Sequence, residues 1–118
     1  MTHSIKCLDL PEEHDYQAAL SYLSLLFDEG RAETLVDMLR AAPVVEFHAK
    51  DIARASGLTL LGADIHHVAH NLDKVKAGKE LSPLLLVRSD HLCIADEFHR
   101  LSAVHLLDED ALIPVKIV

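Results

Sequence analysis

Residues 82–107 read SPLLLVRSDHLCIADEFHRLSAVHLL, and this stretch decides the fold. Residues 83–88 form a continuous apolar run, which is typical of a strand that is buried on both faces. Residues 89–91 favour a turn, and a second short apolar run at 92–95 completes a predicted hairpin. Apolar residues at helical spacing then occupy 98–107. The stretch therefore predicts strand, turn, strand and helix in direct succession.

Four further helices are predicted before this stretch, because apolar residues recur at helical spacing and a glycine or a proline follows the end of each run. The first helix is apolar on nearly every face, which predicts burial in the core or in an interface between copies. A last strand follows the fifth helix, with Pro114 at its start or at a sheet edge. The helices are predicted at residues 15–29, 31–42, 50–56 and 64–76, and the last strand at 113–118.

This order of elements predicts an α+β fold in which a small sheet is packed with helices. The chain has 118 residues, the length of one ordinary domain, and contains no internal repeat or low-complexity linker. We therefore expect a single domain over residues 1–118, with a helical N-terminal part at 1–57 and the sheet-bearing part at 58–118.

Composition restricts the function. Hydrophobic residues make up 50% of the chain, which is high for so small a domain and favours a homodimer that covers some of them. The net charge is −8 with no basic block, so nucleic-acid binding is not expected. We find no signal peptide and no apolar run long enough to span a bilayer. Because the two cysteines are isolated, the sequence predicts a reduced, cytoplasmic protein without a membrane contact.

The turn before the last helix, ADEFHR at residues 95–100, has two interpretations. Asp96 can cap the helix and Glu97 can complement its dipole, so both acids are explained without a ligand. His99 and Arg100 are not explained in this way. A helix start with free N–H groups binds anions, an arginine can clamp a phosphate, and a histidine can move a proton.

The segment LSPLLLVRSDHLCIADEFHRLSAVHLLDEDALIPVKIV at 81–118 resembles the core of the ParB/sulfiredoxin-like superfamily. The shared pattern is an apolar strand, a second strand that ends in a turn with His-Arg, a helix with small residues and a closing I-P-V strand. The resemblance covers residues 58–118, and the helices before it are similar to those of small uncharacterised bacterial ParB-domain proteins. It implies a bacterial protein with a ParB/sulfiredoxin-like sheet after an N-terminal helical extension.

In that superfamily the turn binds nucleotide phosphates. The resemblance implies phosphate contacts from the backbone at Asp96, Glu97 and Phe98 and from the side chains of His99 and Arg100. The implied ligand is a nucleotide or another phosphorylated small molecule, with ATP or CTP and Mg²⁺ as candidates. If the protein is an enzyme, which the sequence leaves open, the catalytic proton-transfer group is His99 and the charge stabiliser is Arg100.

Three departures from the family pattern favour an alternative. Glu97 stands where the family has a glycine, which permits positive φ and close approach to phosphate, whereas a glutamate adds a repelling charge. Phe98 replaces the reactive cysteine of sulfiredoxins, so that chemistry is not expected. The chain is acidic and we find no helix-turn-helix module, so operator binding is not expected either. The alternative is a degenerate, non-catalytic domain that acts through self-association or protein interaction.

Other charged residues are weaker candidates for a functional site. Lys50, with Arg54 or Arg88, is a candidate for basic support of a phosphate, although its segment is also typical of a packing helix. His66 and His70 have a spacing that can hold a metal, but a solvated helix face explains them as well and no metal site is predicted. A nuclease is a third hypothesis, and the absence of a clear carboxylate cluster in the sequence weakens it.

Overall fold

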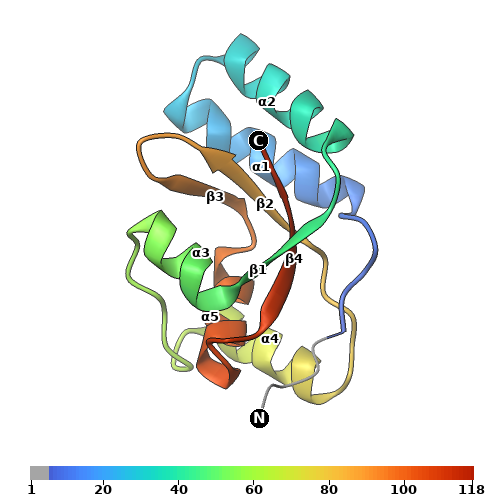
Figure 1. Cartoon of the computed structure of the whole chain (residues 1–118), viewed down its shortest axis with the longest axis vertical. Helices are drawn as coiled ribbons and strands as arrows, with labels where there is room; N and C mark the ends of the chain where they lie inside the picture. Colours follow the sequence, from blue (N-terminus) through green and yellow to red (C-terminus); the bar gives the residue numbers. More distant parts are fainter. Residues whose placement is uncertain (1–5) are drawn as a thin grey trace.

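The computed structural model describes residues 6–118 and contains five helices and one four-stranded mixed sheet (Figure 1). This architecture confirms the predicted α+β class. The helices are α1 (Glu13–Leu26), α2 (Glu29–Ala41), α3 (Ala49–Ser56), α4 (His66–Lys76) and α5 (Phe98–Leu107), and the strands are β1 (Val45–His48), β2 (Leu84–Arg88), β3 (Leu92–Asp96) and β4 (Leu112–Ile117).

The strand order in the sheet is β1-β4-β2-β3. β2 and β3 form the predicted antiparallel hairpin, β4 runs parallel to β2, and β1 is antiparallel to β4. The first four residues of β2 are apolar and buried because the sheet is covered on both faces, and only Arg88 at its end is exposed. Leu84 and Leu86 face a core that contains residues of α3 and α5, whereas Leu85 and Val87 face α1 and α2. In Figure 1, α1 and α2 lie at one end of the molecule and α3, α4 and α5 towards the other.

Strand β1 was not predicted, since residues 1–57 were expected to be helical. It has four residues, all exposed, and its position depends on pairing with β4 far along the chain. The alternation of Val45, Glu46, Phe47 and His48 is compatible with a strand but too short to identify one. The N-terminal part also contributes Ala49 to the core that β2 and β4 share, so it is not a separate helical layer.

Within the single chain, α1 is not buried on all sides, so burial in the core alone does not explain its apolar faces. Tyr16, Ala19 and Leu23 are buried against the sheet and α2, but Leu25 is 84% exposed and Leu26 is half exposed. The helix begins two residues earlier than predicted. Among residues 6–118, the structure contains no helix that is both long enough and apolar enough to cross a bilayer.

Candidate functional site

The predicted turn lies where β3 gives way to α5, and α1 packs beside it. β3 ends at Asp96, Glu97 is the N-cap residue, and α5 starts at Phe98 as predicted. The Asp96 side chain does not cap α5, which corrects one part of the prediction; its carboxyl group faces Asp15 of α1 instead. Two segments about 80 residues apart in the sequence therefore form one acidic site.

Glu97 has a left-handed backbone, with φ of 76° and ψ of 37°. No other non-glycine residue among residues 6–118 has positive φ. This conformation costs a side-chain-bearing residue about 1–2 kcal/mol, and glycine avoids that cost. The turn thus keeps the backbone shape that a glycine would favour while carrying a glutamate.

The Glu97 side chain folds back onto Arg100. The Arg100 Nη2 atom lies 2.9 Å from Glu97 Oε2, and Nη1 donates a 2.8 Å hydrogen bond to the Ser82 carbonyl oxygen. Arg100 is only 7% exposed. Its guanidinium group is therefore committed to partners inside the protein, and the open, positively lined pocket that a phosphate site requires is not formed by this arginine.

Asp15 belongs to the start of α1. Its Oδ2 atom accepts a 2.8 Å hydrogen bond from the Glu12 backbone N–H, in a reciprocal capping arrangement with the Glu12 side chain. The residue has no exposed surface, and its Oδ1 atom accepts no hydrogen bond from the described residues. His14 Nε2 lies 3.3 Å from Oδ1 but outside hydrogen-bond geometry.

Burial, the neighbouring Glu97 carboxylate and the Asp15 carboxylate, in that order, raise the pKa of Asp96 from 3.8 to about 9. Arg100 acts in the opposite direction and does not compensate. The Asp96 Oδ2 atom is buried and also lacks a hydrogen-bond partner in the described part of the chain. Three carboxyl groups thus crowd one site, and burial and the two acidic neighbours disfavour the ionised form of Asp96.

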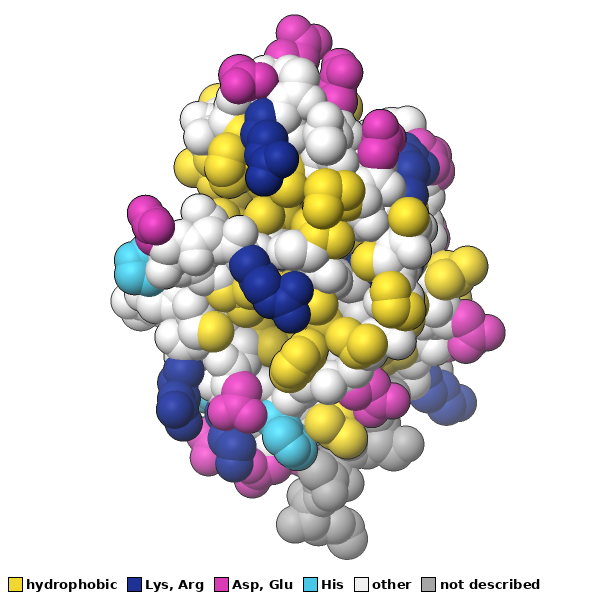
Figure 2. All heavy atoms as spheres, turned by 45° about the horizontal axis from the view of Figure 1, so that its top comes forward, with side chains coloured by type: hydrophobic (Ala, Val, Ile, Leu, Met, Phe, Trp, Pro, Cys, Tyr) yellow, Lys and Arg dark blue, Asp and Glu magenta, His cyan; other side chains and the backbone are white. Residues whose placement is uncertain are grey.

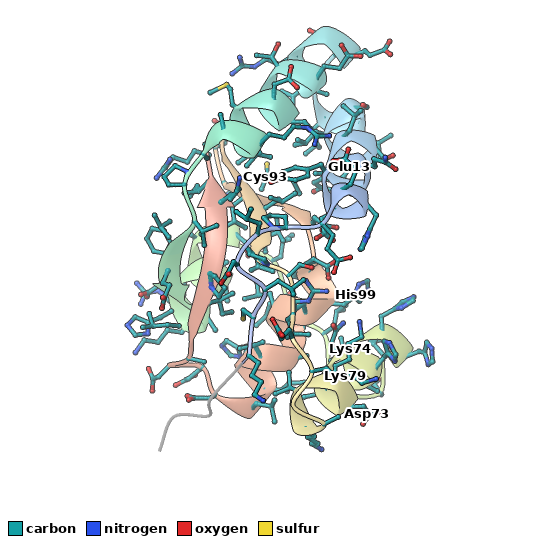
Figure 3. The ribbon with its side chains drawn as sticks, turned by 90° about the vertical axis from the view of Figure 1, so that its right-hand side faces the viewer. Glu13, Asp73, Lys74, Lys79, Cys93 and His99 are labelled. Atoms are coloured by element: carbon teal, nitrogen blue, oxygen red, sulfur yellow. The ribbon has the colours of Figure 1, made fainter. Side chains whose placement is uncertain are left out.

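His99 is half-buried at the start of α5. Its ring lies 5.0 Å from that of His67 in α4 and 6.4 Å from that of Phe98, measured between centroids. Figure 3 shows His99 between the start of α1 and helix α4. Of the predicted pair His66 and His70, His66 contacts the ring of His67, and it is His67 whose ring contacts His99.

The predicted basic residues do not join the turn. The Lys50 ammonium group pairs with Asp110 at 2.5 Å, and Arg54 lies 3.9 Å from Asp51. Arg88 lines a groove elsewhere. Asp96, Glu97, Phe98, His99 and Arg100 lie together because they are contiguous in the sequence, whereas Lys50 lies in a different surface pair.

That groove is an open hollow of about 480 Å³ between β1, α3 and the turn of the β2–β3 hairpin. Apolar side chains dominate its lining, and residues 95–107 do not contribute to it. Figure 2 shows apolar side chains gathered around a basic one on this side of the molecule, with acidic side chains mainly at the rim. The lining includes Phe47, Ile52, Ala55, Arg88, Leu92 and Ile117.

Sequence reasoning missed two features: Asp15 as a partner of the turn, and β1 beside the groove. The first had a partial signal, because Pro11-Glu12 followed by Asp15 is typical of a helix start. No signal in the sequence indicates that this carboxylate packs against residue 96. The expectation that no carboxylate cluster exists is corrected by Asp15, Asp96 and Glu97, whose candidate ligand atoms lie within 4.8 Å of one another.

In comparisons with known proteins, no protein-family model matches the chain, and no curated protein or solved structure matches it. The resemblance to the ParB/sulfiredoxin-like superfamily consequently stays a prediction that rests on the sequence pattern alone.

Proposed function

We propose that this domain is a non-catalytic module that works by self-association, with β1 as the contact edge. The observation that carries the proposal is that β1 pairs with β4 along one edge, lies at the end of the sheet and exposes all four side chains. An exposed edge strand presents unpaired backbone N–H and C=O groups that can bind a further strand. A second copy of the chain offers the same strand.

Self-complementarity selects one register for this pairing. Residues directly opposite in an antiparallel pair lie on the same face, so a two-fold axis passes beside either Glu46 or Phe47. An axis at Glu46 places two like charges opposite each other, which is destabilising. An axis at Phe47 pairs two phenyl rings and sets each Glu46 opposite His48 of the other copy, a favourable arrangement. The second register is the one that we propose.

The groove makes this edge more apolar than an ordinary one. Phe47 is 40% exposed and lines the groove together with Ile52 and Leu92. In the proposed register, Phe47 of the second copy stands next to this lining and shields part of it from water. The ladder is short, so the expected association is weak and depends on concentration.

Sedimentation equilibrium from about 10 µM to about 1 mM protein tests the proposal. We expect an increasing dimer fraction in the wild type and a monomer for Phe47→Glu, since the substitution places two carboxylates opposite each other. Leu25→Glu is the matched control, because it places the same charge at an exposed apolar residue of α1, and it is expected to dimerise as the wild type does. A wild type that stays monomeric throughout the range contradicts the proposal.

Phosphate or nucleotide binding at Asp96 to Arg100 is the second candidate. One observation favours it: no side chain caps α5, so the first N–H groups of the helix are left for another acceptor. His99 would be the proton-transfer group, and Lys50 would have to leave Asp110 to contribute. The Glu97–Arg100 pair and the crowded carboxylates oppose an anion, which is why this function ranks second.

Titration with ATP, CTP and GTP, each with and without Mg²⁺, tests the second candidate by calorimetry. Binding that is lost in His99→Ala supports a phosphate site at the turn. The absence of heat at millimolar nucleotide contradicts it. A bacterial, cytoplasmic origin belongs to the same proposal, because it rests on the resemblance that suggested the nucleotide.

A further inference from the structure

We propose that the carboxylates of Asp15, Asp96 and Glu97 form a binding site for a hard divalent cation, with Ca²⁺ as the best-fitting ion. The inference goes beyond the self-association proposed above and uses a different part of the molecule. Hard cations prefer carboxylate oxygens, and these three side chains supply them from the start of α1 and from the β3–α5 turn.

Proximity of acidic residues is not the main argument, because acidic residues often gather on surfaces without a ligand. Asp15 has no exposed surface, and its Oδ1 atom accepts no hydrogen bond from the described residues, with His14 Nε2 3.3 Å away. The Asp96 Oδ2 atom is also buried and has no hydrogen-bond partner among the described residues. Buried oxygen atoms normally have a partner, so two such atoms on residues of one carboxylate cluster indicate a missing electrophile.

The spacing is compatible with a bound Ca²⁺ ion. The candidate ligand atoms lie within 4.8 Å of one another. Oxygen ligands of Ca²⁺ can be as far apart as about 4.6–5.2 Å, given bond lengths of about 2.3–2.6 Å. Ca²⁺ also tolerates irregular ligand geometry, whereas Mg²⁺ demands a near-ideal octahedron, so Ca²⁺ is the better candidate.

The charges also match a divalent cation. With all three carboxylates ionised, which requires the bound cation to displace the proton of Asp96, the single positive charge of Arg100 leaves two net negative charges at the site. Arg100 contacts Glu97 through Oε2, and the proposed geometry uses the other carboxylate oxygen of Glu97 for the ion. The other terminal nitrogen of Arg100, Nη1, donates a hydrogen bond to the Ser82 carbonyl oxygen.

A proton shared between Asp15 and Asp96 is the competing explanation, because it also relieves the repulsion of the pair. The two explanations predict different results when EDTA-treated protein is titrated with metal salts at pH 7.5. We expect CaCl₂ to bind with a Kd of about 10⁻⁴ to 10⁻³ M and to raise the melting temperature, MnCl₂ and MgCl₂ to bind more weakly, and KCl to have no comparable effect.

Asp96→Asn and Asp15→Asn are the test variants, since the amide keeps the side-chain shape and, at position 15, an acceptor for the Glu12 N–H. We expect each to fold and to lose Ca²⁺ affinity by at least about tenfold. Glu13→Gln is the matched control, because Glu13 is an acid of the same helix that pairs with Arg40 and lies outside the cluster. It is expected to bind Ca²⁺ as the wild type does.

Circular dichroism of each variant without metal separates loss of the site from loss of the fold. Folded Asp96→Asn protein that no longer responds to Ca²⁺, together with an unchanged Glu13→Gln response, supports the site. Two results overturn it: a wild type that shows neither heat nor a melting shift up to about 10 mM CaCl₂, or a folded Asp96→Asn variant that binds Ca²⁺ with wild-type affinity.

Discussion

Two strands of this protein run directly into a helix, and they make the transition in different ways. At the β1–α3 junction the N-cap residue His48 has an ordinary extended backbone, with φ of −69°. At the β3–α5 junction Glu97 has φ of 76° and stands among buried charges. Strain and unpaired polar atoms persist in native proteins mainly where a function needs them. The comparison therefore supports the proposal of a ligand site at the second junction, whereas the proposal for the first is an edge for association.

The largest expected difference between the junctions concerns their ion pairs. Arg100→Ala leaves the Glu97 carboxylate and the Ser82 carbonyl oxygen without a partner in a buried place, and should lower the free energy of unfolding by about 3 kcal/mol. Lys50→Ala removes the solvated pair with Asp110 at the other junction and should change the free energy of unfolding little. Urea unfolding of both variants measures this. Equal losses would contradict the distinction between a buried and a solvated pair.

The next largest expected difference between the junctions is in how stability depends on pH. The Asp96 pKa is about 9 in the folded protein and near 3.8 when the chain is unfolded. Between these values the folded state holds a proton that the unfolded chain releases, so the free energy of unfolding falls as pH rises. Asp96→Asn removes this decline. The stability of the variant relative to the wild type should therefore be higher at pH 8 than at pH 4.5, by about 1–2 kcal/mol after allowance for partial exposure.

Thermal melts of wild type and Asp96→Asn at both pH values, without divalent cations, measure this effect. Asp110→Asn is a suitable control, because Lys50 holds the pKa of that carboxyl group below its ordinary value and its titration lies at acid pH. A pH profile of Asp96→Asn that parallels the wild type above pH 5 would contradict the assignment of the decline to Asp96.

Backbone strain should give a smaller difference. Glu97→Gly and Glu97→Ala both remove the carboxylate, so the comparison between them isolates the backbone. We expect the glycine variant to be more stable than the alanine variant by about 1 kcal/mol. At the other junction His48→Gly and His48→Ala should differ by less, since both positions are N-caps but an extended residue needs no positive φ. An equal difference at both positions would show that Glu97 is not strained.

The smallest expected effect on stability is that of Phe47→Glu. The ring is 40% exposed in the single chain, so the substitution should cost less than about 1 kcal/mol at low protein concentration, where the monomer dominates. At high concentration the cost should be larger, because dimerisation stabilises only the wild type. Unfolding curves at two protein concentrations separate the two contributions.

The sequence predicts most of this fold because its patterns are local. The run at residues 84–87 is apolar because both faces of β2 are covered, and the start of α5 is found at Phe98 as its periodicity indicates. β1 could not be predicted, since four exposed residues form a strand only through β4. The exposure of Leu25 was also missed, because a helix with apolar residues on every face does not reveal which face meets the sheet.

The candidate site was predicted in part for the same reason. Asp96 to Arg100 are contiguous, so a turn with His-Arg drew attention to them. Their actual state depends on long-range packing: Asp15 comes from a distant helix, Arg100 reaches the Ser82 carbonyl, and Lys50 finds Asp110. The importance of Glu97 was apparent from the sequence, while its left-handed backbone and its contact with Arg100 required the structure.

Amide NMR spectra of the ¹⁵N-labelled protein, recorded across protein concentration and then across CaCl₂ or metal-free ATP, test the contrast between the two junctions most directly. We predict that dilution shifts the amides of Val45–His48, that Ca²⁺ shifts those of Asp15 and residues 96–100, and that each change leaves the other set in place. Metal-free ATP should leave both sets unchanged. Shifts of residues 96–100 with ATP but not with Ca²⁺ would contradict this account.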